Sequence, residues 1–447
     1  MIAQKKRLID GPLLGSLITL AGPSVTSMMF MVIFEVVDMF WVGRLGAQPV
    51  AALSASSFYV WMLRGLALAP AIGALARVSR RTGAGDSQAS ARESASAILS
   101  TLFYALAITA LFAPLLAPVF RWLGLSHAVR ILAVEYAGVF LSGLIFVYLM
   151  VTGEHILRGA GDTRTPMIIT GISLLLNVIL DPICIFVFHM GLKGAAFATI
   201  ISQILGAVLM LRQVIKMQPD IIRCPLHPRL HFWKKEFFSL LGLGAPMALS
   251  HATFSIIYLV LSGIISQFGD APLAAVGIAH RIEGLPYFLA LGFSMATATL
   301  VGQNLGAGKP ERAQHAAYLS LRITTVALAV VSILFFFIPQ HIYHLFIDDP
   351  QVIAHGVSYL KIIAIFEIFL GFEVILEGAF SGAGDTKPPF LIIFPITFLR
   401  IPMAWILTTW GGMGVEGVWI TLSVTTFLKG ALLFLWFRRG HWKSHHV

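Results

Sequence analysis

Four acidic residues lie within strongly apolar stretches of the first half of the sequence: Glu35, Asp38, Glu135 and Asp181. The apolar stretches of this half contain a single basic residue, Arg64. We expect Arg64 toward the cytoplasmic end of its span and the four acids toward the outer end. An isolated ionised carboxylate in a medium of low dielectric is too costly to persist. We therefore predict that these acids bind a cation or hold protons, with carboxylates facing a wet vestibule as the alternative.

The neighbours of Asp38 and Asp181 support a binding site. Asn177 lies four residues before Asp181, which puts both side chains on one face of a helix. Thr199 and Tyr136 are expected at a similar depth. Carboxylate, amide and hydroxyl oxygens suit a hard cation such as Na⁺, whereas two close carboxylates equally suit a shared proton. On this pattern the coupling ion is H⁺ or Na⁺.

Pro23 lies fifteen residues before Asp38 in the same apolar stretch. A proline inside a helix frees a backbone carbonyl and favours a kink. We expect a hinge at Pro23, where protonation or cation binding at Asp38 changes the bend of the helix. The alternative is a static kink with no role in coupling.

The second half of the sequence carries buried charges of both signs in equal number. They form a secondary set of candidates, to which Glu35 also belongs. The cations are Arg281, Lys361 and Arg400, and the acids are Glu283, Glu367 and Glu373. Because they can neutralise one another, a structural pairing network is the favoured interpretation.

Helices that span a membrane must position these residues. Of the 447 residues, 57% are hydrophobic and 12% are charged, whereas a soluble domain carries about 25% charged residues. This composition excludes a soluble enzyme, a nucleic-acid-binding protein and a disordered chain. Windows of about 20 apolar residues give twelve spans: 13–42, 48–75, 94–120, 130–152, 166–188, 194–214, 237–267, 272–301, 314–345, 353–380, 389–410 and 415–437.

The basic residues predict the orientation of these spans. Of the 31 Lys and Arg residues, 21 fall on the side of the N-terminus, 4 on the other side and 6 within spans. Cytoplasmic loops carry such an excess of positive charge. We therefore expect a multi-pass protein of the cell membrane with both termini in the cytoplasm, and we attribute the net charge of +10 mainly to this topology.

Short motifs recur at one fixed offset of 223 residues. Gly159-Ala160-Gly161-Asp162-Thr163 returns as Gly382-Ala383-Gly384-Asp385-Thr386, and Pro23 corresponds to Pro246. Because six spans bring the chain back to its starting side, the two halves form a parallel repeat. We predict an N-lobe at 1–212, a cytoplasmic linker at 213–236 and a C-lobe at 237–447. The expected fold is an all-α integral membrane protein with two pseudo-symmetric six-helix bundles around a central cavity.

Other signals are set aside. Cys224, His227 and His231 resemble a zinc string, but neighbouring prolines break any helix and a fourth ligand is lacking. Histidines within the spans are scattered, which argues against a membrane-embedded enzyme. We expect no metal, no cofactor and no nucleic-acid partner. Small amphipathic molecules and membrane lipid are the expected partners, and the chain is expected to act as a monomer.

The sequence resembles the multidrug and toxic compound extrusion transporters along essentially its whole length. The resemblance rests on Ala21-Gly22-Pro23, on the run from Val37 to Ala47 and on the segment from Leu157 to Pro166. It implies that Asp38, Asn177, Asp181 and Thr199 form the cation site of the N-lobe. It also implies an exporter of amphipathic, often cationic compounds, driven by inward flux of H⁺ or Na⁺.

One departure from the family pattern indicates which branch of the family the sequence resembles and which ion it uses. The NorM-like members carry an acidic residue within span 7, whereas residues 246–267 contain none here. The sequence is therefore more similar to the DinF-like branch, in which coupling rests on the N-lobe, and this favours H⁺. The alternatives are a Na⁺-coupled multidrug exporter and a flippase for lipid-linked precursors, which has a related two-lobe plan.

Overall fold

The computed structural model describes residues 8–123, 125–223 and 230–445, and within these ranges it contains helices and no strands. The helices of the first half are α2 (Leu13–Gly43), α3 (Ala47–Leu66), α4 (Leu68–Ala84), α5 (Ser87–Phe112), α6 (Leu116–Trp122), α7 (His127–Ser142), α8 (Leu144–Gly159), α9 (Arg164–Pro182), the π-helix η1 (Ile183–Val187), α10 (Leu192–Met217) and the 3₁₀ helix η2 (Pro219–Arg223). Those of the second half are α11 (Leu230–Ser266), α12 (Asp270–Gly306), α13 (Pro310–Phe337), α14 (Pro339–His344), α15 (Pro350–Ala364), α16 (Glu367–Ala383), α17 (Lys387–Thr409), α18 (Glu416–Arg438) and the 3₁₀ helix η3 (His441–Ser444).

Most of the expected membrane spans coincide with these helices. Among the described residues, ten helical segments are long and apolar enough to cross a membrane, and the bent pair α7 and α8 makes up to eleven. The remaining expected span, 353–380, coincides with α15 and α16, which lie 223 residues after α7 and α8. The all-α membrane fold is therefore confirmed, while the count of twelve spans is matched only when α15 and α16 are taken as one.

Several helices extend beyond the expected boundaries. Helices α3 and α4 together form one span, Gln48–Ala84, although we expected it to end at residue 75. Helix α11 begins at Leu230, inside the expected linker. These extensions follow from polar helical turns that a hydrophobicity window does not register.

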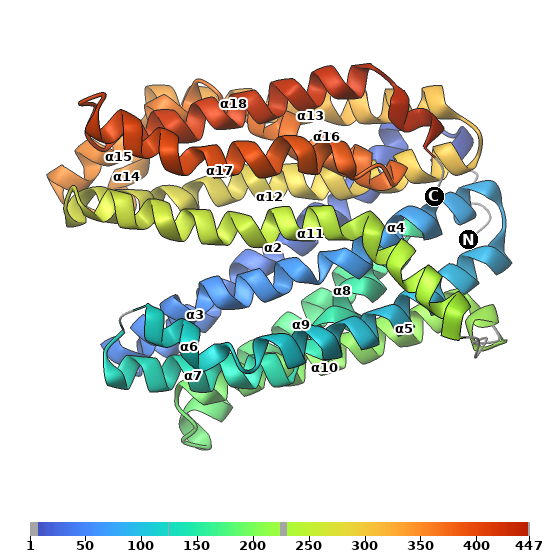
Figure 1. Cartoon of the computed structure of the whole chain (residues 1–447), viewed down its shortest axis with the longest axis horizontal. Coiled ribbons are helices and arrows are strands. Elements are labelled where there is room, and N and C mark those ends of the chain that lie inside the picture. Colours follow the sequence, from blue (N-terminus) through green and yellow to red (C-terminus); the bar gives the residue numbers. More distant parts are fainter. Residues whose placement is uncertain (1–7, 124, 224–229, 446–447) are drawn as a thin grey trace.

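The helices form two groups that correspond to the two halves of the chain. In Figure 1 the second half lies above the first, and the described chain begins and ends at the same end of the bundle, here called the terminal end. The ribbons of the two groups run close together there and diverge toward the opposite, far end. Separate apolar clusters fill the two groups, one around Phe140 and Tyr148 and another around Tyr359 and Trp419.

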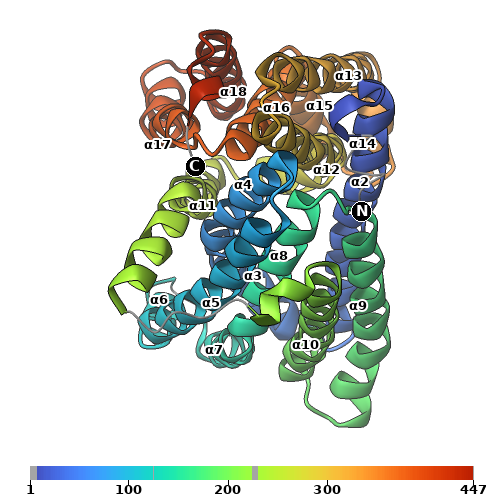
Figure 2. The ribbon, with the colours of Figure 1, turned by 90° about the vertical axis from the view of Figure 1, so that its right-hand side faces the viewer.

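The first helix of each half lies along the boundary between the lobes. Helix α2 packs on α9 of its own lobe and on α12 of the other, and α11 packs on α17 and on α3 and α4. Figure 2, which views the terminal end, shows α2 and α11 on opposite edges of the molecule between the two groups. This arrangement places Asp38, near the C-terminal end of α2, on a helix that contacts both lobes.

Two glycines related by the repeat close the terminal end. A Cβ atom on Gly83 would lie 2.0 Å from the Gln303 carbonyl oxygen, and one on Gly306 would lie 2.0 Å from that of Arg80. The flanking polar side chains follow the same relation. Gln303 Nε2 donates to the Gly159 carbonyl at 2.9 Å, and Arg80 donates to the Ala383 carbonyl at 3.0 Å. The lobes therefore meet backbone to backbone at this end.

Candidate cation-binding site

Three of the predicted N-lobe residues, Asp38, Asn177 and Asp181, interact with one another in the structure. Asp38 lies on α2, Asn177 and Asp181 lie on α9, and Thr199 lies on α10. All four side chains are buried. Asn177 Nδ2 donates to Asp181 Oδ1 at 3.1 Å, as their spacing on one helix face predicts. The carboxyls of Asp38 and Asp181 are close enough to interact electrostatically.

Each of these four residues keeps one oxygen without a hydrogen-bond partner among the described residues. The four atoms are Asp38 Oδ1, Asn177 Oδ1, Asp181 Oδ2 and Thr199 Oγ1. Buried polar atoms are hydrogen-bonded in the great majority of cases, and a buried acceptor left unsatisfied costs about 1–3 kcal/mol. These oxygens lie on three helices of which α9 packs against both α2 and α10, and their chemistry suits a cation or protons on the carboxyls.

Tyr136 and Arg64 complete the surroundings of Asp38. The Tyr136 hydroxyl, on α7, is a hydrogen-bond neighbour of the Asp38 carboxyl. The Arg64 guanidinium acts electrostatically on Asp38 and on Glu35, and its carbon lies 5.6 Å from the centre of the Phe140 ring. We expected Arg64 to be remote from the acids, and this expectation is wrong. Because the span runs on to Ala84, Arg64 lies near its middle and not toward one end.

Two of the N-lobe acids do not join the buried cluster. Glu135 forms an ion pair with Lys193, with Glu135 Oε1 and Lys193 Nζ 3.3 Å apart, and both side chains are about 40% exposed. Glu35 lies one turn before Asp38 on α2 but is exposed. Among the described residues of this lobe, Asp38 and Asp181 are therefore the two buried acids.

Two serines that sequence reasoning missed lie on the same helices as the predicted residues. Ser173 lies one turn before Asn177 on α9, and Ser202 lies three residues after Thr199 on α10. Both are buried, and the hydroxyl of each lacks a partner among the described residues. The signal in the sequence is their helical spacing, four residues from Asn177 and three residues from Thr199.

The C-lobe charges pair differently from the expectation. Lys429 Nζ lies 2.6 Å from Glu373 Oε1, and both residues are buried. Arg400 donates to the hydroxyls of Thr425 and Thr426 on α18. Arg281 and Lys361, which we expected to join this network, are exposed and form no ion pair within the described part of the chain. The expectation that Arg281 and Lys361 pair with the C-lobe acids is therefore wrong, because both side chains lie on exposed helix faces.

Two further C-lobe acids lie close together. Glu283 accepts a hydrogen bond from the Tyr359 hydroxyl at 3.1 Å. Glu367 is buried and interacts electrostatically with Glu283, and one carboxyl oxygen of each has no partner among the described residues. Of the zinc-like string, Cys224 and His227 lie outside the described residues, as does the side chain of His231. Within the described residues no group of three or more His, Cys, Asp or Glu side chains is arranged to hold a metal ion.

A two-lobed helical membrane fold with buried polar groups inside it is typical of multi-pass membrane transporters. The family model MatE matches the chain twice, at residues 23–183 and 246–406. The two matches are offset by 223 residues, the same offset as the repeat. The chain therefore belongs to the MatE family of multidrug efflux transporters.

Individual relatives agree over nearly the whole length. A probable multidrug resistance protein NorM of Thermotoga maritima is 30% identical over 438 residues, which cover 96% of this chain and 93% of the relative. A FAD transporter of Shewanella oneidensis is 26% identical, with 95% and 94% covered. The solved outward-facing structure of a MATE family transporter of the MOP superfamily superposes with a TM-score of 0.89 at 24% identity, covering 98% of each chain. The DinF-like branch stays a prediction.

Proposed function

We propose that this chain is a proton-coupled antiporter that exports amphipathic, often cationic compounds by alternating access. The observation that carries the proposal is the set of four unpartnered oxygens on Asp38, Asn177, Asp181 and Thr199. A buried carboxyl without a partner is stable when it holds a proton or a cation. Exchange of that ion for substrate couples export to the inward ion gradient.

A proton is the favoured coupling ion because the cluster brings two carboxyls together. Two close carboxylates cannot both stay ionised at low cost, and one shared proton relieves their repulsion. The amide and hydroxyl oxygens of Asn177 and Thr199 keep Na⁺ as the alternative. The absence of an acid between residues 246 and 267 supports coupling through the N-lobe.

The proposed mechanism links ion occupancy to helix α2. Helix α2 carries Pro23 and Asp38, runs unbroken from Leu13 to Gly43, and contacts both lobes. We propose that release of the proton from the Asp38 region changes the bend at Pro23 and loosens α2 against α12. The charge bias of the sequence supports placing the terminal end in the cytoplasm. In that orientation the lobes are closed toward the cytoplasm and diverge toward the outside.

The proposal is tested by export of a fluorescent cationic dye from proteoliposomes. A pH gradient alone is expected to drive export by the wild-type protein, and a Na⁺ gradient alone is not. Asp38→Asn should abolish the proton-driven export while leaving the protein folded and able to bind dye. Glu135→Gln is the matched control, because this acid of the same lobe is paired with Lys193 on the surface. Export driven only by Na⁺, or full proton-driven export by Asp38→Asn, would contradict the proposal.

The hinge is tested separately by Pro23→Ala. This variant restores a backbone N–H donor within α2 and favours a straight helix. Dye binding should persist while the export rate falls. An unchanged export rate would show that the proline is only a static kink.

The burial of Arg400 and Lys429 argues against a role for these two cations in a flippase for lipid-linked precursors. A flippase for large anionic head groups would need cations that reach the substrate. Arg400 and Lys429 are each only 2% exposed and are occupied by partners within their own lobe. The same liposome system, with a fluorescent lipid-linked substrate in place of the dye, distinguishes the two functions.

A further inference from the structure

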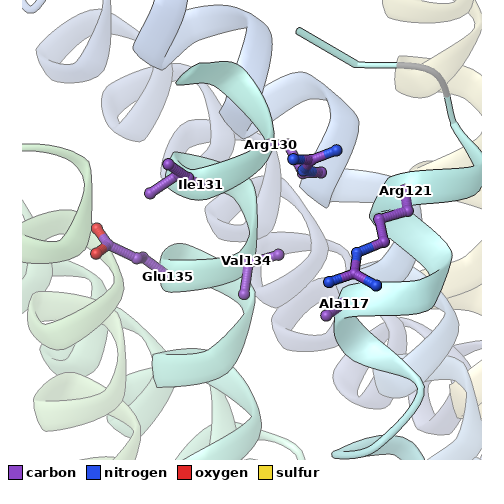
Figure 3. A pocket seen from close by; sticks show the side chains of 6 residues that line it. All are labelled: Ala117, Arg121, Arg130, Ile131, Val134 and Glu135. Carbon is purple, nitrogen blue, oxygen red and sulfur yellow. The ribbon is translucent and has the colours of Figure 1, made fainter. Parts of the chain in front are cut away.

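A shallow groove lies between α6 and α7 at the far end of the N-lobe. Six residues line it: Ala117, Arg121, Arg130, Ile131, Val134 and Glu135. Figure 3 shows Arg121 and Arg130 on the side of α7 that faces α6, whereas Glu135 points the other way, toward the helix beyond α7. The volume of about 190 Å³ is below the range of about 300–1,000 Å³ that is typical of pockets for drug-sized ligands. The groove therefore suits a small charged group.

The groove contains two of the cations of the far end, Arg121 and Arg130. The sequence places four basic residues there: Arg44, Arg121, Arg130 and Lys193. The Arg44 guanidinium is covered by the rings of Phe40 and Trp41, at 4.6 and 4.9 Å, and Lys193 is paired with Glu135.

Neither the Arg121 nor the Arg130 side chain has a hydrogen-bond or ion-pair partner within the residues that the structure describes. Because Glu135 is held by Lys193, it does not compensate them. The groove therefore carries two positive charges that are free to bind an anion.

The surroundings of the groove are apolar and exposed. Ile131 is 44% exposed, Leu115 is 43% exposed and Trp122, the last residue of α6, is 81% exposed. Tryptophan is enriched where a membrane protein crosses from hydrocarbon to headgroups. The short helix α6 buries only Leu116 and Phe120 against the lobe. An apolar surface beside two guanidinium groups matches a molecule with a fatty chain and an anionic head.

We propose that this groove binds the phosphate headgroup of an anionic phospholipid. Arg121 and Arg130 donate hydrogen bonds to the phosphate oxygens, a geometry for which guanidinium groups are well suited. The acyl chains lie along Ile131 and Val134, beside the Trp122 ring. In the orientation given by the charge bias, this lipid belongs to the outer leaflet. A bound lipid fixes α6 against α7, whose residue Tyr136 borders the cation cluster.

The proposal is tested by native mass spectrometry of the purified protein in detergent with equal amounts of phosphatidylglycerol and phosphatidylcholine that carry the same acyl chains. The wild-type protein should retain phosphatidylglycerol in preference. The double variant Arg121→Gln/Arg130→Gln should lose about tenfold or more of that preference, because each cation near an anionic lipid contributes independently. Arg44→Gln is the matched control, since it removes a far-end cation outside the groove, and it should bind like the wild type.

Two further measurements identify the site and the ligand. A phosphatidylglycerol with a photoreactive group near its headgroup should label the peptides of α6 and α7 in the wild type and not in the double variant. An excess of inorganic phosphate should leave the bound lipid in place. Labelling elsewhere, equal retention of both lipids, or an unchanged preference in a folded double variant would overturn the proposal. Displacement by free phosphate would also overturn it, because the groove would then be a site for soluble anions.

Discussion

Removal of the Thr199 hydroxyl tests whether the site binds a proton or Na⁺. A carboxyl takes a proton without help from a neutral ligand, whereas Na⁺ needs several oxygens. We therefore expect Thr199→Val to retain proton-driven export. Because it removes a buried hydroxyl without a partner, it should also stabilise the protein by about 1 kcal/mol. Thermal unfolding in detergent and dye export check both parts. Loss of export together with lowered stability would indicate that the hydroxyl binds a cation.

The buried pair of Lys429 and Glu373 has a structural role in this account. Lys429→Met leaves the Glu373 carboxylate buried and alone, and should destabilise the protein by about 3–5 kcal/mol. The double variant Lys429→Met/Glu373→Gln should recover most of that loss and retain export. Thermal unfolding of both variants measures the recovery. A double variant that is folded but inactive would instead assign the pair to transport.

The residue types of the N-lobe site could be predicted from the sequence, but some of their surroundings could not. The spacing of Asn177 and Asp181 is a local property of one helix, so the contact between their side chains follows from the sequence. The position of Arg64 depends on where its span ends, and Glu135 pairs with a residue of another helix. The same holds for Lys429 and Glu373, which lie on two different helices. Contacts between helices follow from packing, which hydrophobic periodicity does not encode.

At the level of elements, the repeat makes two turns comparable. Asp162, before α9, accepts hydrogen bonds from the backbone N–H groups of Arg164 and Thr165 at 3.1 and 2.9 Å. Its counterpart Asp385, before α17, makes no such bond to the described residues, and burial raises the pKa of its carboxyl. The two turns share a sequence motif, yet only the first is capped by its aspartate.

This difference predicts opposite effects on stability when the two aspartates are replaced. A pKa that is higher in the folded state makes the ionised Asp385 a cost at neutral pH, and this cost disappears as the pH falls and the carboxyl is protonated. Asp385→Asn should therefore raise the unfolding temperature at neutral pH, with the gain vanishing in acid. Asp162→Ala, which loses a cap, should destabilise by about 1 kcal/mol. Thermal unfolding at both pH values checks the pair, and a loss of stability in Asp385→Asn at neutral pH would contradict it.

Span positions were the elements most accessible to sequence reasoning, since about 20 apolar residues are required to cross a membrane. The bends were not. Helices α7 and α8 meet at 52° at Gly143, where a Cβ atom would lie 2.4 Å from the Ile200 side chain. That bend follows from contact with α10, which the local sequence does not reveal.

At the level of the whole molecule, closure of the terminal end depends on Gly83 and Gly306. Valine at both positions would place side-chain atoms against the carbonyl oxygens of the opposite lobe. We expect Gly83→Val/Gly306→Val to shift the protein toward a conformation that is open at this end. Spin labels at Gln88→Cys and Lys387→Cys, with the native cysteines replaced by serine, should report a longer distance. Gly242→Val is the control, because a Cβ atom there meets nothing within 4 Å. An unchanged distance in a folded double variant would contradict this view of closure.

We propose that the buried N-lobe carboxyls exchange a proton for substrate. The most direct measurement is proton release on addition of a cationic dye to the purified protein in a weakly buffered detergent solution. The wild type and Glu135→Gln should release protons on binding the dye, and Asp38→Asn should bind the dye with little or no release. Equal proton release from Asp38→Asn and the wild type would contradict the account.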